Sequence, residues 1–315
     1  MHILVINDEG LAAPGLWALA CGLAHLGRIS VAAPVDSHAG QVGLLGWSHS
    51  AGVESIEVDP AARHLAQVFL VHGTPATCAL LSARPLLASP PDAVVAGIKP
   101  GLTAGVDVWL SGAVSATRTA CLLGRPALAV SLDHHARADD AEPAWETAAD
   151  LAAGILQTLA HERWPAVLLN LNVPDRPHPK LAGLVATVPT AVSGLKVSVQ
   201  EAAPGFYSVR AERPDAAQPE VGSDLWAVSV GLASLSLLPP LPADDHSADL
   251  AALCDSVARL QGSHARRRGA WWRSRVGAPG ASARSAPART AGWSRPGDGS
   301  AVSDGADSGR GTGSR

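Results

Sequence analysis

The chain has 315 residues, of which 47% are hydrophobic and 17% charged, which suits a globular protein with a sizeable α/β core in one large or two modest domains. The first residues contain no basic segment, and no uncharged apolar run reaches the roughly 18 residues of a membrane span, so we expect a soluble, cytoplasmic protein. The net charge of −4 is uneven: residues 263–315 carry +7 and residues 1–262 carry −11, which disfavours a nucleic-acid partner for the acidic part.

The composition changes near residue 262. Residues 263–315 consist mainly of Gly, Ala, Ser, Arg and Pro without periodicity, which predicts a disordered tail. A basic arm that contacts nucleic acid or a membrane surface is the alternative. We therefore expect one domain over residues 1–262, with its core over about 1–180 and hairpins with a closing helix over about 181–262.

The opening segment is a run of four apolar residues at 3–6, and a polar group follows it: Asn7, Asp8, Glu9 and Gly10. This pattern predicts a buried parallel strand with acidic side chains at its carboxyl end, where open α/β sheets bind their ligands. Adjacent carboxylates suit a hard cation such as Mg²⁺ or Mn²⁺. The alternative is that the polar group is a solvated turn.

Strands and helices alternate over about the first 175 residues. The expected helices are 14–26, 75–83, one from 112 onward, and 142–162. The expected strands are 29–34, 53–58, 67–72, 92–98, 126–132 and 166–173. This order predicts a three-layer α/β/α sandwich with a mostly parallel, doubly wound, Rossmann-like sheet.

The four cysteines are far apart in the sequence and lie in apolar segments: Cys21, Cys78, Cys121 and Cys254. No CxxC pair indicates zinc binding or redox chemistry. We therefore expect four buried thiols.

The pattern changes after Pro174. Short β-like segments at 184–188, 205–211 and 233–238 are separated by Pro- and Gly-rich turns. We expect them to form extended hairpins that project from the sheet and build a homodimer or higher homo-oligomer by exchange of elements. A last helix over 247–260 is expected to close the domain.

A glycine-rich loop follows the expected strand at 92–98. Lys99 begins this loop, and Gly101 and Gly105 allow backbone amides to approach an anion. Ser111 and Gly112 then open an alanine-rich helix, whose N-terminus offers free amides to a phosphate group. We expect a phosphate-binding site made of Asn7 and these five residues.

Taken together, the sequence resembles the SurE family of stationary-phase survival proteins over most of residues 1–240. The matching motifs are 7–10 with 13–15, 31–34 with Gly40, 73–76 with Cys78, 96–98 with Gly101, Gly105 and Asp107, 111–114, 169–174, and 223–227 with Gly231 and Ser234. The resemblance implies a 5′/3′-nucleotidase, a phosphomonoesterase that hydrolyses nucleoside monophosphates with a divalent metal. It also implies catalytic and metal-binding roles for Asp8 and Glu9.

The sequence departs from the family at the metal ligands, which are two adjacent aspartates, a serine and an asparagine. Asp8 keeps the first aspartate, whereas Glu9, Ala39 and Lys99 stand at the other three positions. Glu9 still offers a carboxylate, but Ala39 has no ligand oxygen and an ammonium repels Mg²⁺. We therefore expect activity to be weak or altered and the metal to be lost if these replacements abolish its site.

These departures leave several interpretations open. Lys99 could replace the cation while Asp8 orients water on a phosphate ester, or the protein could bind a nucleotide or phosphate without hydrolysing it. An enzyme for another phosphorylated substrate is a third interpretation. The alternative for Lys99 alone is an exposed loop lysine that makes no contact.

Overall fold

The computed structural model describes residues 1–37, 51–57, 65–83, 87, 89–134, 142–190, 192–193, 196–203, 205–212, 219–238 and 247–260. The chain divides into two units, Met1–Gly277 and Ala278–Arg315. The second unit lies entirely outside the described residues, as does the predicted tail over 263–315. All described residues belong to the first unit.

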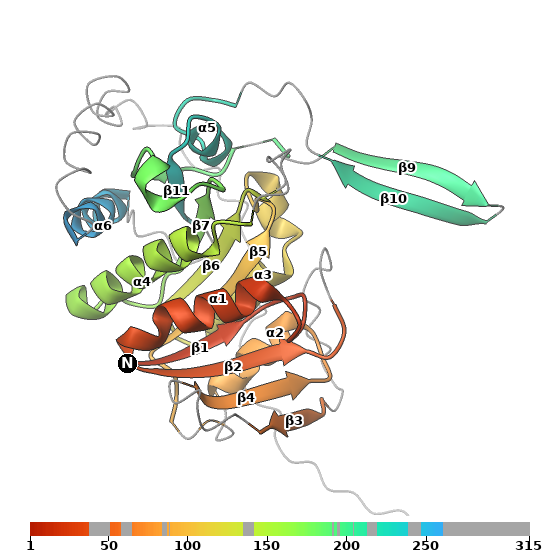
Figure 1. Ribbon diagram of the computed structural model, residues 1–315, viewed down its shortest axis with the longest axis horizontal. Coiled ribbons are helices and arrows are strands. Elements are labelled where there is room, and N and C mark those ends of the chain that lie inside the picture. Colours follow the sequence, from red (N-terminus) through yellow and green to blue (C-terminus); the bar gives the residue numbers. More distant parts are fainter. Residues whose placement is uncertain are drawn as a thin grey trace, which may run out of the picture. The chain divides into compact units, whose positions relative to one another are not determined.

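Within the described residues, nine strands form one sheet in the order β3-β4-β2-β1-β5-β6-β7-β11-β8 (Figure 1). Their bounds are β1 His2–Ile6, β2 Arg28–Pro34, β3 Val53–Ile56, β4 Leu65–Val71, β5 Ala93–Pro100, β6 Ala127–Leu132, β7 Leu168–Val173, β8 Leu184–Thr187 and β11 Ala233–Leu237. The six strands from β4 to β7 in this order are mutually parallel. Strand β3 is antiparallel to β4, and β11 is antiparallel to β7. The predicted mostly parallel sheet is confirmed.

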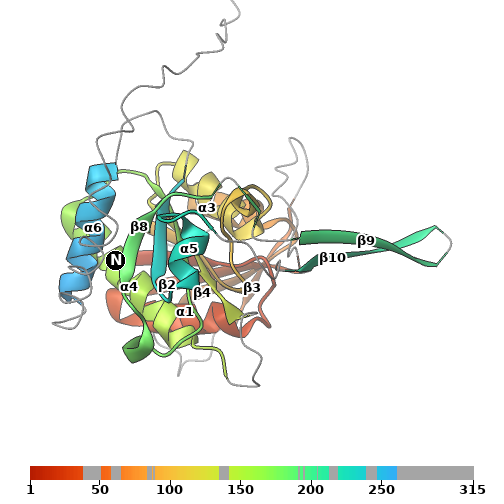
Figure 2. The same cartoon turned by 90° about the horizontal axis from the view of Figure 1, so that it is seen from above.

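Helices cover both faces of this sheet (Figures 1 and 2). On one face lie α1 Pro14–Leu23, α4 Trp145–Glu162 and α6 Ser247–Leu260, and on the other lie α2 Pro75–Leu80 and α3 Gly112–Leu122. The remaining helical segments are α5 Asp224–Ser229, which packs on β11, and the short η1 Ala24–Leu26, η2 Leu81–Ala83, η3 Val106–Trp109 and η5 His178–Lys180. The three-layer sandwich is thus confirmed. No helix in the described part of the chain is both long and apolar enough to cross a membrane.

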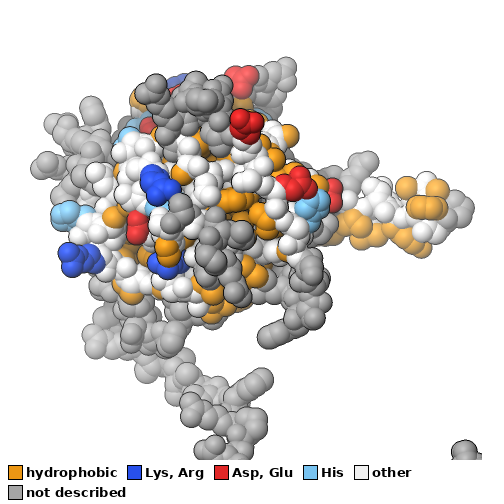
Figure 3. All heavy atoms as spheres, turned by 90° about the horizontal axis from the view of Figure 1, so that it is seen from below, with side chains coloured by type: hydrophobic (Ala, Val, Ile, Leu, Met, Phe, Trp, Pro, Cys, Tyr) orange, Lys and Arg blue, Asp and Glu red, His pale blue; other side chains and the backbone are white. Residues whose placement is uncertain are grey.

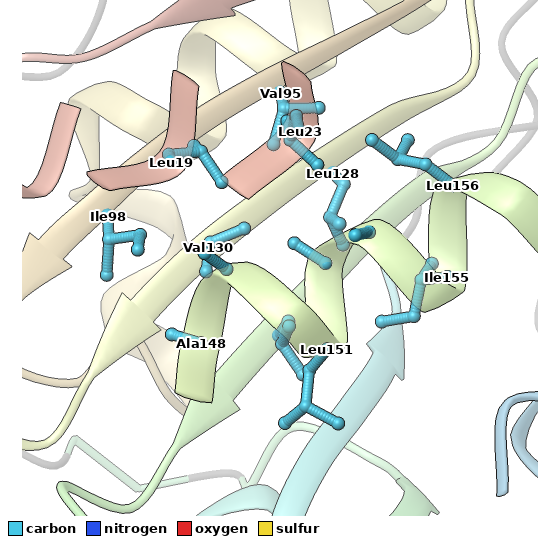
Figure 4. Packing of buried hydrophobic residues seen from close by; sticks show 14 of the residues in the cluster. Leu19, Leu23, Val95, Ile98, Leu128, Val130, Ala148, Leu151, Ile155 and Leu156 are labelled. Atoms are coloured by element: carbon cyan, nitrogen blue, oxygen red, sulfur yellow. The ribbon is translucent and has the colours of Figure 1, made fainter. Parts of the chain in front are cut away.

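The larger core lies between the sheet and the layer formed by α1 and α4. Leu19 and Leu23 of α1 contribute to it together with Val130 of β6 and with Leu151 and Ile155 of α4, and each of these side chains is fully buried (Figure 4). Their helical spacing places them on one face of each helix. Burying one such side chain stabilises the fold by roughly 1.5–3 kcal/mol, which fixes the helices against the sheet.

The segments after Pro174 only partly follow the predicted hairpins. A two-stranded hairpin is formed by β9 Lys196–Ala203 and β10 Phe206–Glu212. In contrast, β8 and β11 belong to the main sheet, where they pair with each other in parallel. Parallel strands cannot be joined by a tight turn, so they need a crossover connection. The prediction of hairpins was therefore wrong for these two strands.

The cysteines follow the prediction with one exception. Cys78, Cys121 and Cys254 are buried free thiols, but Cys21 is exposed. Cys21 lies on α1 next to the buried Ala20, on the side of the helix that faces away from the core. The apolar character of a whole segment does not identify which helix face is buried.

Candidate functional site

The chain order of the strands reverses between β1 and β5. From β1 the chain proceeds outward to β2 and β4 on one side, whereas β5, β6 and β7 extend on the other side (Figure 1). Open α/β sheets bind ligands beyond the carboxyl ends of the strands at such a switch point. The residues that follow β1 and those that end β5 therefore lie where a ligand is expected.

The turn after β1 is built by Asn7. Its Nδ2 donates to the carbonyl oxygen of Gly10 at 2.7 Å, and the Gly10 amide donates to its Oδ1 at 3.2 Å. Gly10 has a φ of +92°, which favours glycine. Asn7 is 1% exposed and Asp8 0% exposed, so these two residues do not form a solvated turn. The Asn7 side chain holds the turn that positions the two carboxylates.

Asp8 lies against the start of α3. A Cβ atom at Gly112 would lie 2.9 Å from both Cβ and Oδ2 of Asp8, so glycine is needed for this close approach. Ser111 caps the helix, because its Oγ accepts a hydrogen bond from the Val114 amide at 3.2 Å. The positive end of the helix dipole favours negative charge at this position. The structure thus brings Asp8, Ser111 and Gly112 together.

Glu9 and Lys99 are both partly buried. The pKa of Glu9 is raised to about 7, chiefly by burial and also by the Asp8 carboxylate, while the Lys99 ammonium opposes the increase. Lys99 lies near the end of β5, where it pairs with Ser131 of β6. Lys99 is therefore not an exposed loop residue, because it lies partly buried within β5. Its charge acts on the carboxylate of Glu9.

The glycine loop is held from within the protein. The Gly101 amide donates to the carbonyl oxygen of Leu132 at 2.7 Å, and the Gly105 amide donates to Oδ2 of Asp224 at 2.6 Å. Asp224 also accepts from the Thr190 amide at 3.0 Å. Burial raises the pKa of Asp224, although these amide hydrogen bonds lower it. In this structure the amides of both glycines fix the path of the loop, and their expected contact with phosphate stays a prediction.

A second anchor of the loop was not predicted. The carbonyl oxygen of Thr103 accepts hydrogen bonds from Asn170 Nδ2 at 2.7 Å and Asn172 Nδ2 at 2.9 Å, and its amide donates to Asn172 Oδ1. Both asparagines are fully buried on β7. The signal was present in the sequence, since two asparagines at alternate positions of an apolar strand need buried partners.

The divalent metal implied by the family resemblance does not fit the side chains at this site. Asp8 and Glu9 supply carboxylate oxygens, but the ammonium of Lys99 has no lone pair to donate. Ala39 lies outside the described residues, and its methyl group has no donor atom. No group of three or more His, Cys, Asp or Glu residues in the described ranges is arranged to hold a metal ion. The four-ligand set of the family is not present in this chain.

The fold and this site define an α/β/α sandwich protein with two carboxylates, a lysine and a helix N-terminus at its topological switch point. The chain belongs to the SurE family, because the family model described as "Survival protein SurE" matches residues 3–193. We call the group formed by Asp8, Glu9, Lys99, Ser111 and Gly112 the switch-point site.

Similar proteins agree with this assignment. A protein from Geobacter metallireducens named "5'-nucleotidase SurE" is 41% identical over 189 residues, which cover 60% of this chain and 70% of that protein. A protein of the same name from Methylococcus capsulatus is 40% identical over 189 residues, covering 59% and 70%. The crystal structure of the SurE protein from Aquifex aeolicus has a TM-score of 0.63 and 27% identity, and the match covers 83% of this chain and all of that one.

Proposed function

We propose that this protein hydrolyses phosphate monoesters, with nucleoside monophosphates as substrates, and that the switch-point site carries out the reaction. The observation that carries the proposal is the convergence of Asp8 and Glu9 after β1, Lys99 at the end of β5 and the start of α3. The names of the two bacterial relatives support the choice of substrate. The proposal includes a cytoplasmic location and a homodimer.

The chemistry follows from the charges of the site. Lys99 and the first amides of α3 bind the non-bridging oxygens of the phosphate dianion. Asp8 orients a water molecule, whose oxygen bonds to phosphorus as the bond from phosphorus to the ester oxygen breaks. Glu9 accepts a proton from that water, and the leaving oxygen takes a proton from solvent. A carboxylate with a pKa of about 7 suits proton transfer near neutral pH.

The test is the release of phosphate from a panel of nucleoside monophosphates and a chromogenic phosphate ester. Replacing Asp8→Asn should lower kcat by roughly 10²–10³-fold, since it removes the charge that orients the water. Asp150→Asn, which changes an exposed aspartate on α4, is the matched control and should leave the rate unchanged. Equal rates for wild type and Asp8→Asn would contradict the proposal.

The second candidate is a protein that binds a nucleotide or phosphate without hydrolysing it. It is favoured by Lys99, which can hold an anion but cannot ligate the cation expected in the family. Equilibrium binding of nucleoside monophosphates without release of phosphate would select this candidate. The same assays would detect another phosphorylated substrate if only the chromogenic ester is hydrolysed.

A further inference from the structure

The position of Lys99 is set by the register of two neighbouring parallel strands. Ile6 of β1 pairs with Ala96 of β5, and this is the last pair between the two strands. Glu9 lies three residues beyond Ile6, and Lys99 lies three residues beyond Ala96. The irregularity that β5 shows between Ala96 and Lys99 lies just before the lysine. The two side chains therefore come from adjacent strand ends at the switch point.

Charge coupling agrees with this placement. Lys99 stabilises the ionised form of Glu9, whereas Asp8 disfavours it. One ammonium and two carboxylates thus act on one another at the end of β1. Charges interact more strongly at a partly buried site than in bulk water, so this group responds to any added ion.

Within this group the ammonium of Lys99 favours an anion over a divalent cation, whereas the carboxylates of Asp8 and Glu9 act in the opposite sense. A bound Mg²⁺ would need oxygen ligands and would be repelled by the ammonium. A phosphate dianion gains from the same ammonium, which offers three N–H donors, and from the start of α3 beside Asp8. Lys99 is partly buried on a strand, so its charge is less screened than that of a surface lysine.

We propose that the ammonium of Lys99 binds the phosphate group of the substrate in the place that a divalent metal takes in the family, so that this protein binds phosphate without a metal. The inference rests on the proposed function for the identity of the substrate. It does not rest on that function for its test, because binding of inorganic phosphate can be measured without any turnover.

The first experiment measures the binding of inorganic phosphate to the full chain by calorimetry, in the presence of EDTA. Wild type should bind, and Lys99→Gln should bind at least about tenfold more weakly, because a charge-assisted contact is lost. Lys99→Arg keeps a cation and should retain part of the affinity. Lys180→Gln changes an exposed lysine on η5 and should match wild type. Melting temperatures would show that each variant is folded, and Lys99→Met would replace Lys99→Gln if the latter is not.

The second experiment measures Mn²⁺ binding by electron paramagnetic resonance. Wild type should leave Mn²⁺ free at micromolar protein concentration. The triple variant Glu9→Asp, Ala39→Ser, Lys99→Asn restores the ligand types of the family and should bind Mn²⁺ at least about tenfold more tightly than wild type. The inference is overturned if wild type binds Mn²⁺ in a way that Asp8→Asn abolishes, if wild type does not bind phosphate in EDTA, or if Lys99→Gln binds phosphate as wild type does.

The proposed function can fail separately. Binding of phosphate through Lys99 with no hydrolysis of any ester would leave the inference standing and remove the proposed activity. Hydrolysis that EDTA abolishes and Mg²⁺ restores would support the activity and overturn the inference.

Discussion

The pKa of Glu9 reflects the charges and the burial of the switch-point site. Burial is the largest cause of its raised pKa, the neighbouring Asp8 adds to the increase, and Lys99 opposes it. In the unfolded chain the pKa returns to the ordinary value of 4.5. The folded state therefore binds more protons than the unfolded state between pH 4.5 and about 7.

This difference predicts a pH-dependent stability. The contribution of Glu9 to the free energy of unfolding is fully present below pH 4.5 and is lost as the pH rises through about 7. Glu9→Gln should lack this loss, so at pH 8 it should be more stable than wild type by roughly 1–2 kcal/mol, after discounting for partial exposure. Thermal unfolding at pH 5 and pH 8 measures the effect, with the exposed Glu146→Gln on α4 as control. If the melting temperatures of wild type and Glu9→Gln change equally between these two pH values, the partly buried environment assigned to Glu9 is contradicted.

The location of the site could be predicted from sequence, whereas part of its hydrogen bonding could not. Asp8 and Glu9 follow β1 and Lys99 lies near the end of β5, and the carboxyl ends of adjacent parallel strands lie at one edge. The partners of Gly101 and Gly105 are Leu132 and Asp224, which are 31 and 119 residues away. No local pattern identifies such distant partners.

At the scale of elements, α5 holds the glycine loop although it was not predicted. Six residues are too few to show a helical period, but Ser223 caps the helix by accepting from the Trp226 amide. Strand β9 was also missed, although apolar and polar residues alternate over 196–200. Segments 184–188 and 233–238 were correctly predicted as strands, yet local alternation does not reveal which strands pair.

Removing the Asp224 carboxylate should loosen the glycine loop. Asp224→Ala leaves the buried amides of Gly105 and Thr190 without their acceptor, which should lower the free energy of unfolding by about 2–4 kcal/mol. The rate of hydrogen exchange at the Gly105 amide should rise because the loop is less well held. Denaturant unfolding measures the loss of stability, and a loss below about 0.5 kcal/mol would show that Asp224 does not anchor the loop.

Replacing Arg118 on α3 should have the opposite effect and stabilise the fold. Its guanidinium lies 4.6 Å from the centre of the Trp109 ring, and burial lowers its pKa. Its buried Nε and Nη2 have no hydrogen-bond partner within the described residues. Unpaired donors cost about 1–3 kcal/mol, more than the roughly 0.5–1 kcal/mol of the cation–π contact.

Arg118→Met should therefore raise the melting temperature of the isolated protein. Arg28→Met, at an exposed arginine on β2, is the matched control and should have little effect. A lower melting temperature for Arg118→Met would indicate that the guanidinium finds a partner in solution.

At the scale of the whole molecule, the β9–β10 hairpin extends away from the sheet (Figure 2). Val199 pairs with Val209, and Val197 and Tyr207 lie two residues from them along the same strands, so these four side chains share one face. Val199, Tyr207 and Val209 are 60%, 63% and 66% exposed, and hydrophobic side chains run along the hairpin (Figure 3). A hairpin alone cannot cover such a stripe.

We expect a second copy of the chain to cover this stripe. Light scattering at micromolar concentration should show a dimer, and Val199→Asp with Val209→Asp should shift it to monomer, because burying these charges is unfavourable. Ser198→Asp with Ser208→Asp changes residues out of phase with this stripe and should leave the dimer intact. If the wild type is a monomer, the hairpin does not form a dimer interface.

The most direct test of Lys99 as a replacement for the metal is the metal dependence of hydrolysis, measured side by side for two proteins. Phosphate release from a nucleoside monophosphate is followed with EDTA and with Mg²⁺ or Mn²⁺, for wild type and for the variant Glu9→Asp, Ala39→Ser, Lys99→Asn. Wild type should give equal rates under both conditions, whereas the variant should become active only with metal. A wild-type activity that EDTA abolishes and metal restores would contradict the role of Lys99.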